Sequence, residues 1–290
     1  MHKRIIQIKQ GVGMDFIRAL VLLCVALITS PATASDSKFS ALQGNPELRS
    51  ASAIVLDSNG GLIYGKEVDT VRPIASITKL MTAMVVLDAG LDLDETITIT
   101  MEDRDLIRQT GSRLQFGARL QRRELLLLAL MSSENRAATA LGRTYPGGMQ
   151  SFVTAMNNKA ISLEMRDSRF ADPAGLKAEN VSTASDLAKM VTAADSYSLI
   201  TQSTTTAKMD VRPYANRGPL TYANTNRLLK SEDWDIELSK TGYINEAGRC
   251  LVMQANIDGE DVSIVLLNSF GKLTPYGDSN RLRKWMLASS

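Results

Sequence analysis

Ser76 and Lys79 form a Ser-x-x-Lys pair shortly after Pro73, where a helix is expected to begin. Residues three positions apart on a helix lie about 5 to 6 Å from each other on one face, so a hydroxyl and an amine would share a surface. A serine needs a base to attack a carbonyl, and a lysine can be that base only if burial or a second cation lowers its pKa toward neutrality. The apolar neighbours Leu80 and Met81 favour burial. The pair therefore predicts a serine nucleophile activated by a lysine.

The Ser-x-x-Lys pattern is common in itself, since it also occurs at residues 35–38 and 269–272. A second element favours the first pair over the other two. Ser133 and Asn135 follow the strongly apolar segment 125–131, so a hydroxyl and an amide would emerge at the end of a rigid, buried helix. Such a position suits catalytic groups, whereas a helix end with solvated polar residues is the structural alternative.

The third element is a Lys-Thr-Gly triplet near the end of the chain. Lys240, Thr241 and Gly242 are expected on a strand, because apolar residues alternate with polar ones around them. The lysine would supply the second cation, and the glycine would let a substrate backbone approach closely. An edge strand with a solvated lysine is the structural alternative. The Tyr-x-Asn triplets at 214–216 and 222–224 are rivals to the second element, but they lie in turn-rich sequence without a supporting helix.

The composition excludes several other catalytic classes. The only histidine among the 290 residues is His2. If the N-terminus is removed, no imidazole is left, which excludes Ser-His-Asp, Cys-His and His-Glu-x-x-His chemistry. Cys250 would then be the only thiol, and its apolar flank predicts a buried core residue rather than a nucleophile.

Residues 1–34 are predicted to be a signal peptide. Basic residues precede an apolar run at 19–28, and a small-x-small sequence predicts cleavage after Ala34 and export to the periplasm. This run is about half as long as a membrane span requires. Met14 is an alternative start of translation. Cleavage would lower the net charge from +2 to about −1, so the pI of 8.5 is no argument for nucleic-acid binding, and none is expected.

The remaining chain is predicted to be of the α+β class, with a lead at residues 35–49 and one domain at residues 50–290. Strands are expected at 53–56, 62–64, 236–241, 250–257 and 262–268, and helices at 76–89, 122–131, 134–144, 149–165, 185–194 and 280–288. Strands at both ends of the sequence imply one sheet in which the first and the last strands meet. The basic residues of the final helix could touch an anionic membrane peripherally, but packing of this helix on the sheet is the favoured interpretation.

The ordered set of Ser-x-x-Lys, Ser-x-Asn and Lys-Thr-Gly is the signature of penicillin-binding proteins and serine β-lactamases. The chain resembles low-molecular-mass penicillin-binding proteins of the periplasmic D-alanyl-D-alanine endopeptidase type in three stretches, 72–95 (RPIASITKLMTAMVVLDAGLDLDE), 125–138 (LLLLALMSSENRAA) and 239–253 (SKTGYINEAGRCLVM). The resemblance extends over about residues 50–285. It implies an antiparallel β-sheet flanked by helices, with a helical subdomain, as in the DD-peptidases and β-lactamases.

The resemblance also implies roles for the residues of the first two motifs. Ser76 would be the nucleophile that forms an acyl ester, and Lys79 would accept its proton. Ser133 and Asn135 would relay protons and position the substrate. No metal and no organic cofactor is required by this chemistry.

The third motif would bind the substrate. The resemblance implies that Lys240 and Thr241 bind the carboxylate or peptide of the ligand, beside Gly242. The backbone N–H groups of Ser76 and Tyr243 would form the oxyanion hole, in which each donor is typically worth about 3 to 4 kcal/mol of the barrier. Lys272 is one of several candidates for binding the leaving side of the substrate.

The implied reaction is hydrolysis of the D-alanyl–diaminopimelate cross-links of peptidoglycan, with β-lactam antibiotics as covalent inhibitors. Rapid penicillin hydrolysis of the class A type is not expected, because no Glu-x-x-Leu-Asn sequence occurs between Asn135 and Lys240. A D-Ala-D-Ala carboxypeptidase is the second candidate. The endopeptidase is favoured because the related carboxypeptidases carry an additional β domain and a membrane-binding tail, for which the residues after Gly242 leave no room. A non-catalytic cell-wall binding protein is the alternative of a different class.

Overall fold

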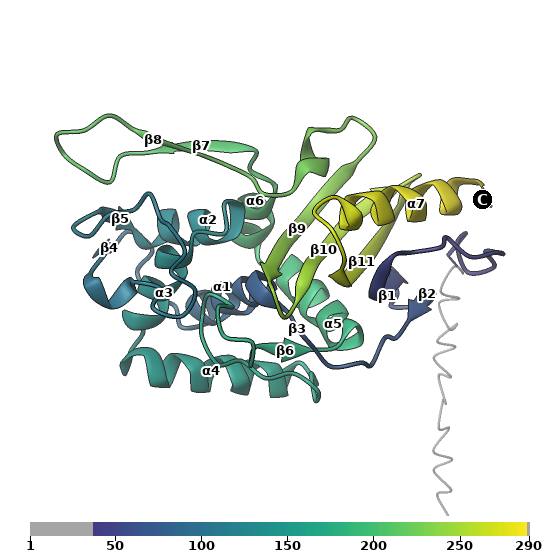
Figure 1. The fold of residues 1–290 in the computed structure, drawn as a ribbon, viewed down its shortest axis with the longest axis horizontal. Helices are drawn as coiled ribbons and strands as arrows, with labels where there is room; N and C mark the ends of the chain where they lie inside the picture. The colour runs from purple at the N-terminus through teal and green to yellow at the C-terminus, as the bar shows by residue number, and fades with distance from the viewer. Residues whose placement is uncertain (1–36, 289–290) are drawn as a thin grey trace, which may run out of the picture. The chain divides into compact units, whose positions relative to one another are not determined.

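A computed structural model of the chain describes residues 37–288, coloured by residue number in Figure 1. The predicted signal peptide, with its cleavage after Ala34, lies outside the described residues. Within the described part no helix is long and apolar enough to cross a membrane.

A five-stranded antiparallel sheet is the centre of the fold. Its strands lie in the order β2-β1-β11-β10-β9. Their bounds are Ser50–Asp57 for β1, Leu62–Lys66 for β2, Asp235–Ile244 for β9, Gly248–Ile257 for β10 and Glu260–Ser269 for β11. Pairing of β1 with β11 joins the two ends of the sequence, as predicted.

Helices cover both faces of this sheet (Figure 1). The helix α7 (Thr274–Ala288) packs on one face, where Leu282 and Met286 are fully buried, so the predicted packing of the last helix is confirmed. It begins six residues earlier than expected, with Pro275 in its first turn, where a missing N–H costs little. The helices α5 (Ala184–Asp195) and α6 (Ser198–Thr205) cover the opposite face. Coverage of both faces explains the unbroken apolar run at 264–267 in β11.

The remaining helices form a helical subdomain beside the sheet. They are α1 (Thr78–Asp88), α2 (Arg122–Met131), α3 (Asn135–Arg143) and α4 (Gly148–Ser162). All residues of α1 from Thr78 to Val86 are buried, because α1 is packed among the helices α2 to α6. This makes α1 a rigid support for any side chain at its N-terminus.

Several short elements differ from the sequence-based expectation. The helix α6 has a Ser- and Thr-rich sequence that is typical of a loop. Three pairs of short strands are likewise absent from the prediction, β3 (Arg72–Pro73) with β6 (Val181–Ser182), β4 (Thr96–Thr98) with β5 (Arg119–Gln121), and β7 (Lys208–Val211) with β8 (Leu220–Ala223). Strands this short carry almost no periodicity, so tertiary contacts determine them.

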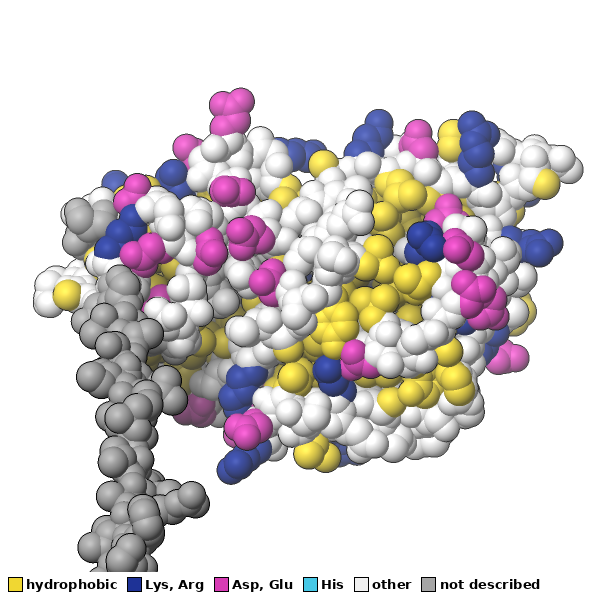
Figure 2. All heavy atoms as spheres, turned by 180° about the vertical axis from the view of Figure 1, so that it is seen from behind, with side chains coloured by type: hydrophobic (Ala, Val, Ile, Leu, Met, Phe, Trp, Pro, Cys, Tyr) yellow, Lys and Arg dark blue, Asp and Glu magenta, His cyan; other side chains and the backbone are white. Residues whose placement is uncertain are grey.

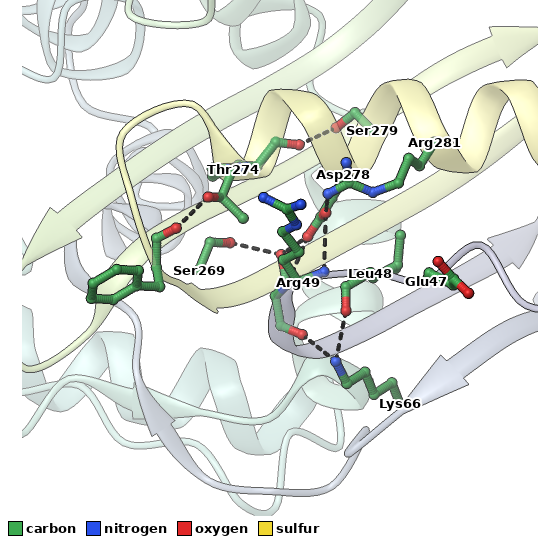
Figure 3. A network of polar contacts seen from close by, with 12 residues as sticks. Glu47, Leu48, Arg49, Lys66, Ser269, Thr274, Asp278, Ser279 and Arg281 are labelled. Atoms are coloured by element: carbon green, nitrogen blue, oxygen red, sulfur yellow. Dashed lines mark hydrogen bonds and ion pairs between the residues drawn. The ribbon is translucent and has the colours of Figure 1, made fainter.

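A buried carboxylate ties the start of β1 to α7 (Figure 3). Asp278 accepts hydrogen bonds from the backbone N–H groups of Arg49 and Ser50 at 3.1 and 2.7 Å, and from the Ser50 hydroxyl. It also pairs with Arg281, one turn further along the helix. The Lys66 ammonium donates to the carbonyls of Leu48 and Ser50 on the other side of the strand.

The surface carries charges of both signs. Figure 2 shows apolar side chains gathered in the middle of the face opposite to that of Figure 1, with basic and acidic side chains interspersed around them. This distribution agrees with a net charge near zero.

Candidate active site

Ser76 lies in a 3₁₀ turn (η1, Ala75–Ile77) that leads directly into α1. The preceding residue, Ala75, has a φ of +48°, which is unfavourable for a residue with a side chain. Two glycines make room for this turn. A Cβ on Gly175 would lie 2.0 Å from the carbonyl oxygen of Ala75, and one on Gly242 would lie 2.9 Å from that of Ile74. The sequence assigns Gly242 to substrate approach, but its absent side chain first allows β9 to pass beside the serine turn.

Lys79 is fully buried on the first turn of α1, beneath Ser76. Its Nζ lies 2.8 Å from Ser76 Oγ, 2.8 Å from Asn135 Oδ1 and 2.6 Å from the carbonyl oxygen of Ala174. The structure therefore brings together the first two motifs as predicted. It adds Ala174, a backbone acceptor that the sequence did not reveal.

The amide of Asn135 is oriented by a chain of hydrogen bonds. Its Nδ2 donates to Thr110 Oγ1 at 2.9 Å, and this hydroxyl donates to Asp105 at 2.7 Å. Because the Thr110 proton is used by Asp105, the threonine oxygen accepts from Asn135. The Oδ1 atom of Asn135 is therefore the one that faces Lys79.

The Ala174 carbonyl is held by a second carboxylate. Asp172 accepts from the backbone N–H groups of Ala174, Gly175, Leu176 and Lys177 at 2.7 to 3.2 Å. The loop that bears Ala174 is thereby fixed against α1 without a regular helix or strand.

The two fixed acceptors determine what an uncharged Lys79 can do. A neutral amine has two N–H donors and one lone pair. The Asn135 Oδ1 atom and the Ala174 carbonyl can only accept, so they take both N–H groups. The lone pair is then directed at Ser76 Oγ, which is the arrangement a general base requires.

Burial lowers the pKa of Lys79 to about 7, while the carboxylates of Asp172, Glu134 and Asp105 act in the opposite direction. The neutral amine is therefore available near neutral pH. The sequence predicts that Lys240, as a second cation, contributes to such a lowering, whereas the lowering effect found for Lys79 is burial. Burial also lowers the pKa of Lys240, and the positive charge of Lys79 lowers it further.

The third motif lies on β9, next to the other two. Lys240 is buried, and its Nζ donates to Ser133 Oγ at 3.0 Å and to the Thr241 carbonyl at 2.9 Å. The Thr241 hydroxyl donates to Thr225 at 2.7 Å. Ser133 has a φ of +59°, and Ala75, the residue before Ser76, has one of +48°; strained backbone of this kind occurs more often at functional sites than elsewhere.

A cavity of about 400 Å³ opens above these groups. Six predicted residues line it, Ser76, Ser133, Asn135, Thr241, Gly242 and Tyr243. The side chains of Lys79 and Lys240 are buried beneath its surface. Three segments far apart in the sequence therefore converge on one concave site, as a serine hydrolase with a lysine base requires.

The other residues that the sequence offers as site candidates lie in different parts of the structure. Lys272 lines the cavity, whereas Ser269 is buried and hydrogen-bonds to Ser50, so these two residues form no pair. Tyr222 is buried on β8 outside the cavity. Cys250 borders the cavity from β10, but burial raises the pKa of its thiol to about 11, in agreement with a non-nucleophilic role.

Three residues that position the site are not predicted by the sequence, namely Asp105, Thr110 and Asp172. The only signal they give is that of aspartates followed by turn residues, which is common in loops. No group of three or more His, Cys, Asp or Glu side chains among residues 37–288 is arranged to hold a metal ion.

Comparison with known families establishes the relationship of the chain. The sequence model described as Peptidase S11, D-alanyl-D-alanine carboxypeptidase, matches residues 39–271. The chain belongs to the S11 peptidase family. The match includes all three motifs and both carboxylate-anchored loops.

Two relatives of this S11 peptidase carry the same name. The chain is 46% identical over 273 residues to the D-alanyl-D-alanine endopeptidase of Pseudomonas aeruginosa, covering 93% of this chain and 88% of that protein. It is 44% identical over 266 residues to the D-alanyl-D-alanine endopeptidase of Escherichia coli, covering 91% and 86% of the two chains. The predicted resemblance is thus confirmed.

The S11 peptidase is also similar in structure to the Streptomyces K15 DD-transpeptidase. The TM-score is 0.79 at 28% identity, and the match covers 85% of this chain and 100% of the other. The predicted α+β fold of the DD-peptidase type is confirmed.

Proposed function

We propose that this S11 peptidase is a serine DD-peptidase that hydrolyses D-alanyl cross-links in peptidoglycan through an acyl ester on Ser76. The observation that carries the proposal is the environment of Lys79. Its Nζ lies 2.8 Å from Ser76 Oγ, its pKa is lowered to about 7, and its other two hydrogen-bond partners can only accept. These three properties together make it a base for this one hydroxyl.

The proposed reaction has two halves. Lys79 takes the proton of Ser76 as Oγ bonds to the D-alanyl carbonyl carbon, and the amide C–N bond then breaks. Ser133, which hydrogen-bonds to Lys240, relays the proton that Lys79 has taken to the leaving amine, so Ser133 keeps its hydroxyl and Lys79 is neutral again. Water hydrolyses the ester in the second half, again with Lys79 as base. The N–H groups of Ser76 and Tyr243 would stabilise the oxyanion.

The third motif is proposed to bind the leaving part of the substrate. Thr241 lines the cavity, and the Lys240 side chain lies beneath it, where Nζ donates to the Thr241 carbonyl. A carboxylate next to the scissile bond would accept hydrogen bonds at this position. Asn135 would bind the amide on the acyl side, since its side chain reaches the cavity from α3.

Endopeptidase activity is favoured over carboxypeptidase activity. Both relatives described above are named endopeptidases, whereas the family model bears the name of a carboxypeptidase. The two activities share the acyl ester and differ only in the leaving amine, which is a cross-linked peptide in one and free D-alanine in the other.

The proposal includes partners and location. Cross-linked peptidoglycan is the substrate, β-lactams acylate Ser76 as inhibitors, and any membrane contact is peripheral. Export through a signal peptide at residues 1–34, with a lead at 35–49 and the catalytic domain at 50–290, is part of the same proposal.

Covalent labelling with a fluorescent penicillin tests the nucleophile. We expect wild-type protein to be labelled and Ser76→Ala to remain unlabelled at unchanged thermal stability. Ser269→Ala is the matched control, because Ser269 belongs to a second Ser-x-x-Lys pattern but is buried away from the cavity. Equal labelling of Ser76→Ala and wild type would refute the assignment.

Digestion of purified cross-linked muropeptide dimers, followed by mass spectrometry, separates the two enzymatic activities. We expect dimers to be converted to monomers. Release of D-alanine from pentapeptides with dimers left intact would instead establish the carboxypeptidase. A protein that binds peptidoglycan but cleaves neither substrate would be the non-catalytic alternative, which the cost of burying two lysines argues against.

A further inference from the structure

Three cations line part of the catalytic cavity, and we refer to them as the cationic wall. They are Arg227 from the turn η3 (Arg227–Lys230), Arg249 from β10, and Lys272 from the loop before α7. The residues that line this cavity include no Asp or Glu. The wall thus gives one part of the site a strong positive potential that the reaction steps described above do not use.

The register of the sheet locates Arg249 relative to the third motif. Tyr243 lies opposite Arg249 in the pairing of β9 with β10, and Thr241 lies opposite Leu251. Residues that are opposite or two apart project to one face of a sheet, so Arg249 shares the face of Thr241 and Tyr243. The Arg249 guanidinium carbon stacks 3.8 Å from the centre of the Tyr243 ring, which fixes its position. Arg249 therefore continues the surface to which a substrate carboxylate would bind.

Tyr276 connects Arg249 with a second member of the wall. Its hydroxyl donates to the Thr225 carbonyl at 3.1 Å, and burial raises its pKa while the positive charges of Arg227 and Arg249 act in the opposite direction. Two arginines from distant segments thus approach one side chain that itself lines the cavity.

The cations of the wall have no acidic partner. Within residues 37–288, no carboxylate oxygen lies within 4.0 Å of the charged nitrogens of Arg227, Arg249 or Lys272, whereas Arg108, for example, pairs with Glu246 at 2.8 Å. Clustered charges of one sign repel each other, and an anionic ligand would relieve that repulsion.

We propose that the cationic wall binds the carboxylates of the peptide that leaves in the first half of the reaction. This inference rests on the proposed function and specifies its leaving group. When the amide C–N bond breaks, free D-alanine would depart with one carboxylate, which Lys240 and Thr241 can take. A cross-linked stem peptide departs with a carboxylate beside its released amine and at least one more further along. The wall supplies the additional cations, so it selects an anionic peptide over a single amino acid.

Two synthetic peptides with the same acyl part and the same scissile D-alanyl bond test the wall. In one, the leaving diaminopimelyl-alanine keeps both of its carboxylates, and in the other the carboxylate beside the released amine is kept while the one further along is a carboxamide. We expect wild type to prefer the carboxylate peptide about tenfold in kcat/KM at low salt, with a smaller preference at about 0.5 M salt. Arg249→Gln and Lys272→Gln should remove this preference, mainly through KM, and leave cleavage of the carboxamide peptide within about twofold.

Lys230→Gln is the matched control, since it removes one exposed positive charge from the same turn as Arg227 but outside the cavity. It should leave both rates unchanged, and Arg249→Lys should restore part of the preference. Penicillin labelling at Ser76 verifies that each variant is folded. Equal cleavage of both peptides by wild type would contradict the proposed role of the cationic wall and would leave the proposed endopeptidase activity standing. Cleavage of neither peptide by an enzyme that still releases D-alanine from pentapeptides would overturn the endopeptidase itself.

Discussion

The Nζ atom of Lys79 lies 2.8 Å from Oγ of Ser76, and the lysine side chain is completely buried. The two residues are three positions apart, yet Ser76 belongs to a 3₁₀ turn and Lys79 to the following α-helix. The turn raises the hydroxyl to the cavity surface while the amine stays beneath it. This division separates the group that meets the substrate from the group that accepts the proton.

The acylation rate should depend on pH through Lys79. Below a pH of about 7 the amine is protonated and has no lone pair, so acylation by penicillin should be slow. At higher pH it is neutral, so the rate should rise and reach half its maximum near the pKa of about 7. Stopped-flow labelling across a pH range of roughly 5 to 9 measures the profile.

Lys79→Arg is the corresponding variant. A guanidinium stays protonated at every pH in this range, so acylation should fall by at least about a hundredfold. Acylation of the Lys79→Arg enzyme as fast as that of wild type would contradict the base assignment.

Glu134 should contribute, with Asp172 and Asp105, to the position of that pH profile. Its carboxylate raises the pKa of Lys79 against the larger effect of burial. Glu134→Gln removes this negative charge, so the pKa of Lys79 should fall and the rise of the acylation rate should move to lower pH. The maximal rate at high pH should stay within about twofold of wild type. The exposed Glu232→Gln, which removes the same charge far from the lysine, should leave the profile unchanged. A shift of the profile to higher pH in the Glu134 variant would contradict the expectation that the Glu134 carboxylate raises the pKa of Lys79.

Thr110 should act through the orientation of Asn135. Thr110→Val removes the oxygen that accepts from Asn135 Nδ2, so the amide is free to turn its N–H groups toward Lys79. We expect a roughly tenfold slower acylation, the effect of about one hydrogen bond. Thr110→Ser keeps the hydroxyl and should retain most of the rate. A Val variant with wild-type kinetics would mean that other contacts orient the amide.

The catalytic residues of the site could be predicted from the sequence better than the groups that hold them in position. Ser76 and Lys79 are local in the sequence, and α2 ends at Met131 as its apolar run predicts, which places Ser133 correctly. The Ala174 carbonyl is different, because a backbone oxygen has no residue type and its partner lies 95 positions away. Asp172, which holds that carbonyl, has the sequence environment of an ordinary turn.

In the fold, too, elements determined by their local sequence could be predicted, and elements determined by distant contacts could not. The three long strands at the C-terminus could be predicted because ten-residue segments carry a clear pattern and end at turn residues such as Asp258 and Gly259. The hairpin of β7 and β8 and the helix α6 could not, since their polar sequences favour loops locally. Packing of α6 against β9 and α2 provides the stabilisation that its own sequence lacks.

Asp278 should be a main anchor of β1, independent of catalysis. Its fully buried side chain accepts from two backbone N–H groups and the Ser50 hydroxyl (Figure 3), so Asp278→Asn places an amide N–H against donors. We expect a loss of about 2 to 3 kcal/mol in the free energy of unfolding, measured by denaturant titration. Asp258→Asn breaks the exposed ion pair with Lys38 and should cost less than about 0.5 kcal/mol. Equal losses in the two variants would show that burial of the Asp278 network contributes nothing, because exposure is the main difference between the two carboxylates.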